Sequence, residues 1–112
     1  MQITPLTTPK FYAAQTTTVR TAKTGPGVLA GYMIYNPNAT VAYVQFLDVA
    51  GSGTVTLGTT VPVLSLPIPA TGAANLNGLN ISFANGIQLA CTTTATGSTA
   101  PSTGLDVNVW FS

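Results

Sequence analysis

The chain has 112 residues and five charged side chains, and it contains no His and no Glu. Charged residues make up 4% of the sequence, whereas an ordinary soluble domain carries about a quarter. General acid–base catalysis needs a His or a carboxylate with a tuned pKa, and metal sites need clusters of His, Cys, Asp or Glu. The composition therefore predicts no enzyme, no catalytic residue, no cofactor and no metal site.

The rest of the composition predicts one all-β domain. Hydrophobic residues make up 46% of the chain, which is enough for a single packed core at this length. Thr, a β-branched residue that favours strands, is the most frequent polar residue, and no segment repeats apolar residues with the period of an amphipathic helix. Apolar runs end well short of about 18 residues, so we expect no transmembrane helix, and the first residues do not predict a signal peptide.

The first half of the chain predicts an arm followed by strands. Residues 1–9 are expected to form an extended N-terminal arm, because Pro5 and Pro9 interrupt regular pairing, and residues 10–112 to form a single β-sandwich domain. A first strand is predicted over 11–19.

Residues 28–35 are apolar on both faces, which predicts a central strand covered on both sides. The turn at Asn36-Pro37-Asn38 is expected to join this strand to 40–47 in an antiparallel hairpin.

The second half alternates loops and strands. Loops are expected over 48–53, 69–80 and 94–104, and strands over 55–57, 60–68, 81–83 and 87–93. Pro62 and Pro67 mark the strand over 60–68 as an edge strand, because Pro donates no ladder hydrogen bond.

The final strand has the clearest alternation in the sequence. Leu105, Val107, Val109 and Phe111 are predicted to face the core, and Asp106, Asn108 and Trp110 the other side. Seven or eight such strands, with turn signals about every ten residues, predict an antiparallel β-sandwich or jelly roll. The alternative is a small closed barrel.

Four side chains are candidates for interaction. Lys10, Arg20 and Lys23 are the only cations and all lie in the first 23 residues; they form a mildly basic segment that meets an acidic partner, or they reflect chance placement among few charges. Trp110 lies at a subunit or ligand interface, or is covered by the second sheet or the long loop. A net charge of +1 argues against nucleic-acid binding, which needs clustered Lys and Arg.

Cys91 is the single cysteine, so no intramolecular disulfide can form. It shares a strand face with Ile87 and Leu89 and lacks a His to act as its base. We interpret it as a buried structural thiol.

Sparse charge also constrains the surface. A small domain with so few charges tends to associate with itself, so part of the surface is expected to be buried against copies of the chain or a partner. The alternative is that Thr, Ser, Asn and Gln supply the solubility.

From about Gly31 onward, the chain resembles a group of small virion proteins encoded by tailed phages. The stretches that carry the resemblance are Tyr35-Asn36-Pro37-Asn38 leading into Val44-Gln45-Phe46-Leu47-Asp48, then residues 58–72, then residues 83–101. The resemblance implies a capsid decoration (cement) protein, a homo-oligomer, with a trimer favoured, that binds the major capsid protein on the outer surface of the virion.

A module of a phage tail or head fibre that binds a receptor or glycan is the alternative function. In that interpretation, aromatic residues offer a stacking face for sugars, and the candidates are Trp110, Tyr12, Tyr32, Tyr35 and Tyr43.

Overall fold

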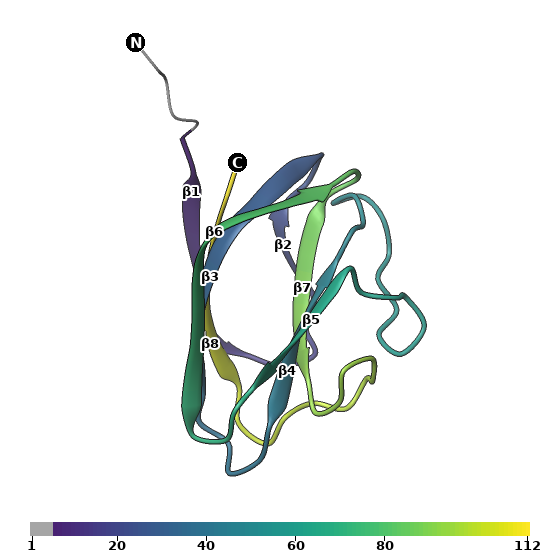
Figure 1. Ribbon diagram of the computed structural model, residues 1–112. Coiled ribbons are helices and arrows are strands. Elements are labelled where there is room, and N and C mark those ends of the chain that lie inside the picture. Colours follow the sequence, from purple (N-terminus) through teal and green to yellow (C-terminus); the bar gives the residue numbers. More distant parts are fainter. Residues whose placement is uncertain (1–5) are drawn as a thin grey trace.

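The computed structural model describes residues 6–112, which form eight β-strands and no helix. The strands are β1 (Thr8–Gln15), β2 (Arg20–Lys23), β3 (Gly27–Asn36), β4 (Ala42–Leu47), β5 (Leu64–Ile68), β6 (Gly72–Phe83), β7 (Ile87–Thr92) and β8 (Leu105–Phe111). They make two four-stranded antiparallel sheets with the orders β1-β8-β3-β6 and β2-β7-β4-β5, which face each other in Figure 1. The predicted all-β sandwich is confirmed.

The strand pairing is nested along the chain. β1 pairs with β8, β2 with β7, β3 with β6 and β4 with β5, and the pairs β3–β8 and β4–β7 complete the two sheets. This is one long antiparallel hairpin folded over on itself, which is the topology of a jelly roll. The two sheets stay separate, so the alternative of a closed barrel is wrong.

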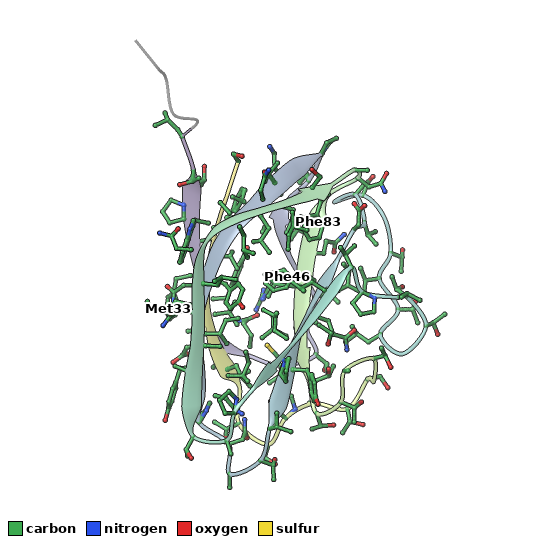
Figure 2. All side chains as sticks on the ribbon, in the orientation of Figure 1. Met33, Phe46 and Phe83 are labelled. Atoms are coloured by element: carbon green, nitrogen blue, oxygen red, sulfur yellow. The ribbon has the colours of Figure 1, made fainter. Side chains whose placement is uncertain are left out.

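The core lies between the two sheets. Phe46 of β4 and Phe83 at the end of β6 are among its largest side chains and point into the space between the sheets, as Figure 2 shows. β8 alternates buried and half-buried residues along its whole length, with Leu105, Val107, Val109 and Phe111 in the core. This confirms the alternation predicted for the last strand.

The predicted hairpin of 28–35 with 40–47 is wrong. β3 pairs with β6 and β8, β4 pairs with β5 and β7, and the segment between β3 and β4 crosses from one sheet to the other. The turn residues determine this path: the buried Asn36 donates from Nδ2 to the carbonyl oxygens of Thr40 and Ile68, each at 3.0 Å, and so bonds across the crossing. A turn signal between two apolar runs does not say in which sheet the second run lies.

The loop predicted over 69–80 is also wrong, because β6 runs from Gly72 to Phe83. It is an edge strand whose side chains are mostly exposed, so its Ala, Asn and Gly residues show no apolar alternation. Its backbone pairs with β3 on both sides of a register shift, and Gly78, at a φ of +76°, lies where β6 carries the extra residues. Backbone hydrogen bonds to β3 hold this strand in the sheet, so an apolar pattern in the sequence does not reveal it.

The start of the chain differs from the expected arm and first strand. Residues 1–5 of the expected arm lie outside the described residues, and its last two, Thr8 and Pro9, pair with β8. Pro9 is tolerated because β1 is an edge strand. The strand expected over 11–19 ends at Gln15, and the chain then crosses to the other sheet as β2; the strand expected over 55–57 is absent. β5 is an edge strand, as Pro67 predicted.

Cys91 is fully buried in the core cluster with Ile87 and Leu89, as predicted. Burial raises the pKa of its thiol to about 12. Because the thiolate is the reactive species, we expect Cys91 to resist iodoacetamide in the folded protein at pH 8 and to react at once in denaturing urea. Mass spectrometry of the alkylated chain measures this, and equal alkylation rates with and without urea would contradict it.

Candidate functional site

The outer face of the β2-β7-β4-β5 sheet is covered by the chain's own loops. Most outward residues of β4 and β7 are buried, and these are Gln45, Leu47, Gln88, Ala90 and Thr92; Tyr43 is half-buried. The covering segments are residues 48–63 and 93–104, which Figure 1 draws on the outer side of this sheet. Side-chain amides fasten them: Gln45 Nε2 donates to the Gly97 oxygen at 3.1 Å, and Gln88 Nε2 to the Ala50 oxygen at 2.8 Å. The chain's own loops thus cover most of the two central strands of this sheet.

The outer face of the β1-β8-β3-β6 sheet carries no such loop among the described residues. The register places its outward side chains in rows across the four strands, with Pro9, Trp110, Gly31 and Asn77 in one row and Phe11, Asn108, Met33 and Asn75 in the next. Asp106 and Tyr35 begin a third row. We call this surface the open face, defined by Pro9, Phe11, Met33, Tyr35, Asn75, Asn77, Asp106, Asn108 and Trp110.

Large apolar side chains are exposed on the open face. Phe11 is 60% exposed, Met33 50% and Tyr35 45%. Figure 2 labels Met33, whose side chain points away from the core that holds Phe46 and Phe83. Scattered exposed apolar residues need no explanation, but a contiguous group on one sheet face marks an interaction surface.

The indole ring of Trp110 lies against the sheet in the open face. A Cβ added to Gly31 would lie 2.3 Å from two atoms of the indole, so the ring of Trp110 lies directly over Gly31. The indole nitrogen donates a hydrogen bond to Asn77 Oδ1 at 3.3 Å, which fixes the direction of the ring. Glycine on β3 therefore allows the ring to lie against the sheet, and neither the second sheet nor the long loop covers Trp110.

A hollow of about 410 Å³ adjoins Trp110 on this face. It is lined by residues 9–11 of β1, Met33 of β3 and residues 108–110 of β8. The Asn108 amide beside it donates to the Met33 oxygen at 3.2 Å. The lining is mostly apolar side chain, and its only charged member is Lys10 at the edge.

Asp106 is the charged side chain within the open face, and it stabilises the bulge of β1. Its Oδ1 accepts a hydrogen bond from the backbone N–H of Ala14 at 3.0 Å, where β1 makes a bulge against β8. Ala14 has a φ of 51° in the left-handed region, which a residue with a side chain rarely adopts. This bond helps to hold the strained residue, so one carboxylate oxygen of Asp106 already has a partner within the chain.

The structure brings two of the four predicted interaction residues together. Lys10 and Trp110 border the same hollow. Arg20 and Lys23 lie on β2 of the other sheet, where Arg20 Nε donates to Gln15 Oε1 at 3.0 Å. The three cations therefore do not form one basic patch with the open face.

The tyrosines separate in the same way. Tyr32 is buried and Tyr12 packs against the core, while Tyr43 belongs to the other sheet. Tyr35 alone shares the open face with Trp110. The sequence did not predict Phe11 and Met33 as site residues. The pattern of 28–35, apolar on both faces, was the available signal. The prediction that this strand is covered on both sides is wrong, because Met33 and Tyr35 on its second face are 50% and 45% exposed.

Asp48 closes the turn between β6 and β7. Its Oδ1 accepts hydrogen bonds from the backbone N–H groups of Asn85 and Gly86, at 2.8 and 3.3 Å, and its Oδ2 from that of Ala84 at 3.1 Å. Desolvation by the turn acts to raise the pKa of the carboxyl, but these hydrogen bonds favour the charged form and leave the pKa below its usual value.

We therefore expect Asp48 to contribute to acid sensitivity. A carboxyl whose folded pKa is lowered stabilises the fold above its unfolded pKa of about 4, and this stability is lost as the pH falls through the folded pKa. The Asp48→Asn variant should show a urea midpoint that declines less between about pH 5 and about pH 2.5 than that of the wild type. An identical decline in both proteins would show that Asp48 does not carry this effect.

No group of three or more His, Cys, Asp or Glu that could hold a metal ion occurs among residues 6–112. No helix in the same part of the chain is long and apolar enough to cross a membrane. Searches of protein-family models, of curated proteins and of solved structures find no match for this chain. The arguments for function consequently rest on the residues themselves and on the open face.

Proposed function

We propose that this chain is a non-enzymatic structural protein of a virion, a capsid decoration (cement) protein that binds the major capsid protein on the outer surface of the shell. One observation carries the proposal furthest: in the described part of the chain, loops cover the central strands of one sheet and leave the outer face of the other, with its exposed apolar side chains and few charges, open. A surface of this kind suits a protein that is held in a fixed assembly. The resemblance to phage virion proteins suggests that this assembly is a capsid.

The architecture fits this task. Binding a lattice requires many modest contacts rather than one reactive centre, and a rigid jelly roll presents faces, edges and loops without an ordering cost. A homo-oligomer, with a trimer favoured, would engage several capsid subunits at once and gain affinity through multivalency. The role requires no nucleic acid, membrane or cofactor as a partner.

Copy number and position in the particle test this proposal. We expect quantitative mass spectrometry of particles from the virus that encodes the chain to find it in hundreds of copies, and cryo-electron microscopy to place it at junctions between capsomers. Absence from purified particles would overturn the proposal.

A second candidate function is a receptor- or glycan-binding module, and the geometry of Trp110 favours it. An indole that lies flat on the sheet, beside the amides of Asn77 and Asn108, offers a stacking surface flanked by hydrogen-bonding groups. A few copies at the tail, rather than many on the shell, would support this candidate over the first.

A further inference from the structure

We propose that the open face is the surface through which copies of this chain associate with one another. The proposed function includes a homo-oligomer, and this inference names the surface that forms it in solution without a capsid. Two open faces packed on each other form a twofold dimer, whereas the proposed function favours a trimer. The occupant is a second copy of the chain, packed against the outer face of the β1-β8-β3-β6 sheet.

Among residues 6–112, no loop covers the open face. Most outward residues of β4 and β7 are buried beneath loops 48–63 and 93–104, whereas Phe11, Met33 and Tyr35 are 45–60% exposed. Covering these three side chains removes apolar surface from water, which is the main favourable term in protein association. Phe11 lies on β1 and Met33 and Tyr35 lie on β3, with Trp110 on β8 between these two strands, so one flat surface can cover them together.

Charge is sparse on and around the open face. Asp106 is the charged side chain of the face, with its Oδ1 accepting the Ala14 N–H, and Lys10 lines the adjoining hollow. Two isolated charges of opposite sign do not favour a strongly acidic or basic partner, while two open faces can meet with little cost for desolvating ions. A surface that complements the open face carries apolar groups and few charges, and the open face of a second copy is such a surface.

The nature of the polar groups also favours a second copy. Asn75, Asn77 and Asn108 are amides, which both donate and accept hydrogen bonds. A surface whose polar groups only donate or only accept cannot pair with its own copy, but an amide can. The open face is thus compatible with itself in polar as well as apolar groups, as a symmetric interface requires.

The hollow beside Trp110 adds a place for a partner side chain. It has a volume of about 410 Å³ and a largely apolar lining that includes Met33, and Phe11, which borders it, is the most exposed aromatic residue of the face. A side chain of the second copy would fill this space, and a buried aromatic anchor in a pocket contributes most where it excludes water.

The size of the face sets the expected affinity. Four strands at about 4.8 Å spacing and six residues at about 3.4 Å each give a footprint of about 19 by 20 Å. This is about 380 Å² in projection, well below the area of about 800 Å² per partner that a standard stable interface buries. We therefore expect weak association, with a dissociation constant of about 100 µM and little effect of salt, because few charges are involved.

Sedimentation equilibrium on the full chain from about 1 µM to about 200 µM tests this inference. The wild type is expected to form dimers reversibly. Met33→Lys places a charge in the middle of the face and should raise the dissociation constant at least tenfold. Val61→Lys, the same charge change on a side chain that is 81% exposed in loop 48–63, is the matched control and should associate like the wild type. If Met33→Lys does not fold, Phe11→Lys on the edge strand β1 replaces it.

The other outcomes are distinct. A wild type that stays monomeric at about 200 µM, or a Met33→Lys variant that associates as tightly as the wild type, would overturn the inference. So would a monomer whose Trp110 fluorescence responds to maltoheptaose or chitohexaose, since the face would then belong to a neutral glycan. An oligomer that Met33→Lys dissociates, from a chain absent from particles, would support this inference while refuting the proposed function.

Discussion

Replacing Asn36 by alanine is expected to lower the free energy of unfolding by about 3–5 kcal/mol, which is among the largest effects of a single substitution. Asn36 is completely buried at the crossing between the two sheets. Its Nδ2 donates to the carbonyl oxygens of Thr40, Ile68 and Pro69, at 3.0, 3.0 and 3.3 Å. Its Oδ1 accepts from the backbone N–H and the side-chain Nδ2 of Asn38, at 2.9 and 2.8 Å.

The network continues to the C-terminal loop, which is why the effect is large. Asn38 Nδ2 donates to the Thr103 oxygen at 2.8 Å, and Asn38 Oδ1 accepts from the Thr103 N–H at 2.8 Å. Two asparagines thus join the β3–β4 crossing, the β5–β6 turn and the loop before β8. Alanine at position 36 leaves several buried polar groups without partners, and each costs about 1–3 kcal/mol.

Urea unfolding at one fixed protein concentration, followed by circular dichroism, measures this prediction, because association alters apparent stability. Asn80→Ala is the matched control: Asn80 is exposed on β6, and the same substitution there should change stability by no more than about 0.5 kcal/mol. Similar values for the two variants would contradict the role assigned to the asparagine network.

The second large effect is expected from Phe46→Ala, which should cost about 3–5 kcal/mol. Phe46 is fully buried on β4 and points between the sheets (Figure 2). Alanine removes most of the side chain from a core that is closed on both sides, so the loss combines transfer of apolar surface with a cavity.

Phe11→Ala is the matched control for Phe46→Ala, because it makes the same substitution on the open face. Phe11 is 60% exposed and contributes little to the monomer's core, so at a concentration where the chain is monomeric we expect a change of no more than about 1 kcal/mol. A loss as large as that of Phe46→Ala would mean that Phe11 belongs to the fold, and that the open face is not a free surface.

The all-β sandwich and several of its strands could be predicted from the sequence because nearby residues mark them. The residues of β8 alternate along its whole length. Pro67 correctly predicted that β5 is an edge strand, and the pattern around Cys91 correctly predicted its core neighbours Ile87 and Leu89. In each case, the local residues carry the information. The predicted hairpin of 28–35 with 40–47 and the loop predicted over 69–80 show where this local information ends.

Those errors have a common physical cause. Sheet membership depends on contacts between residues far apart in the chain, such as the bond from Asn36 to Ile68, 32 positions away. β6 is held by backbone pairing with β3 and leaves its side chains in the open, so its composition carries no strand pattern. The same dependence explains the candidate site: the apolar second face of β3 was visible in the sequence, but whether anything covers it is decided by where the loops go.

Oxidation of Met33 by dilute hydrogen peroxide tests most directly whether the open face is covered in the assembled state. Met33 is half exposed at the centre of the face, and the only other methionine is Met1, so peptide mapping separates the two. The sulfoxide should form at least about tenfold more slowly in purified particles than in the isolated chain at high dilution, because a neighbouring protein excludes the oxidant. Equal oxidation rates in the particle and in the dilute chain would contradict the account, since the face would then remain bare in the place where it is proposed to act.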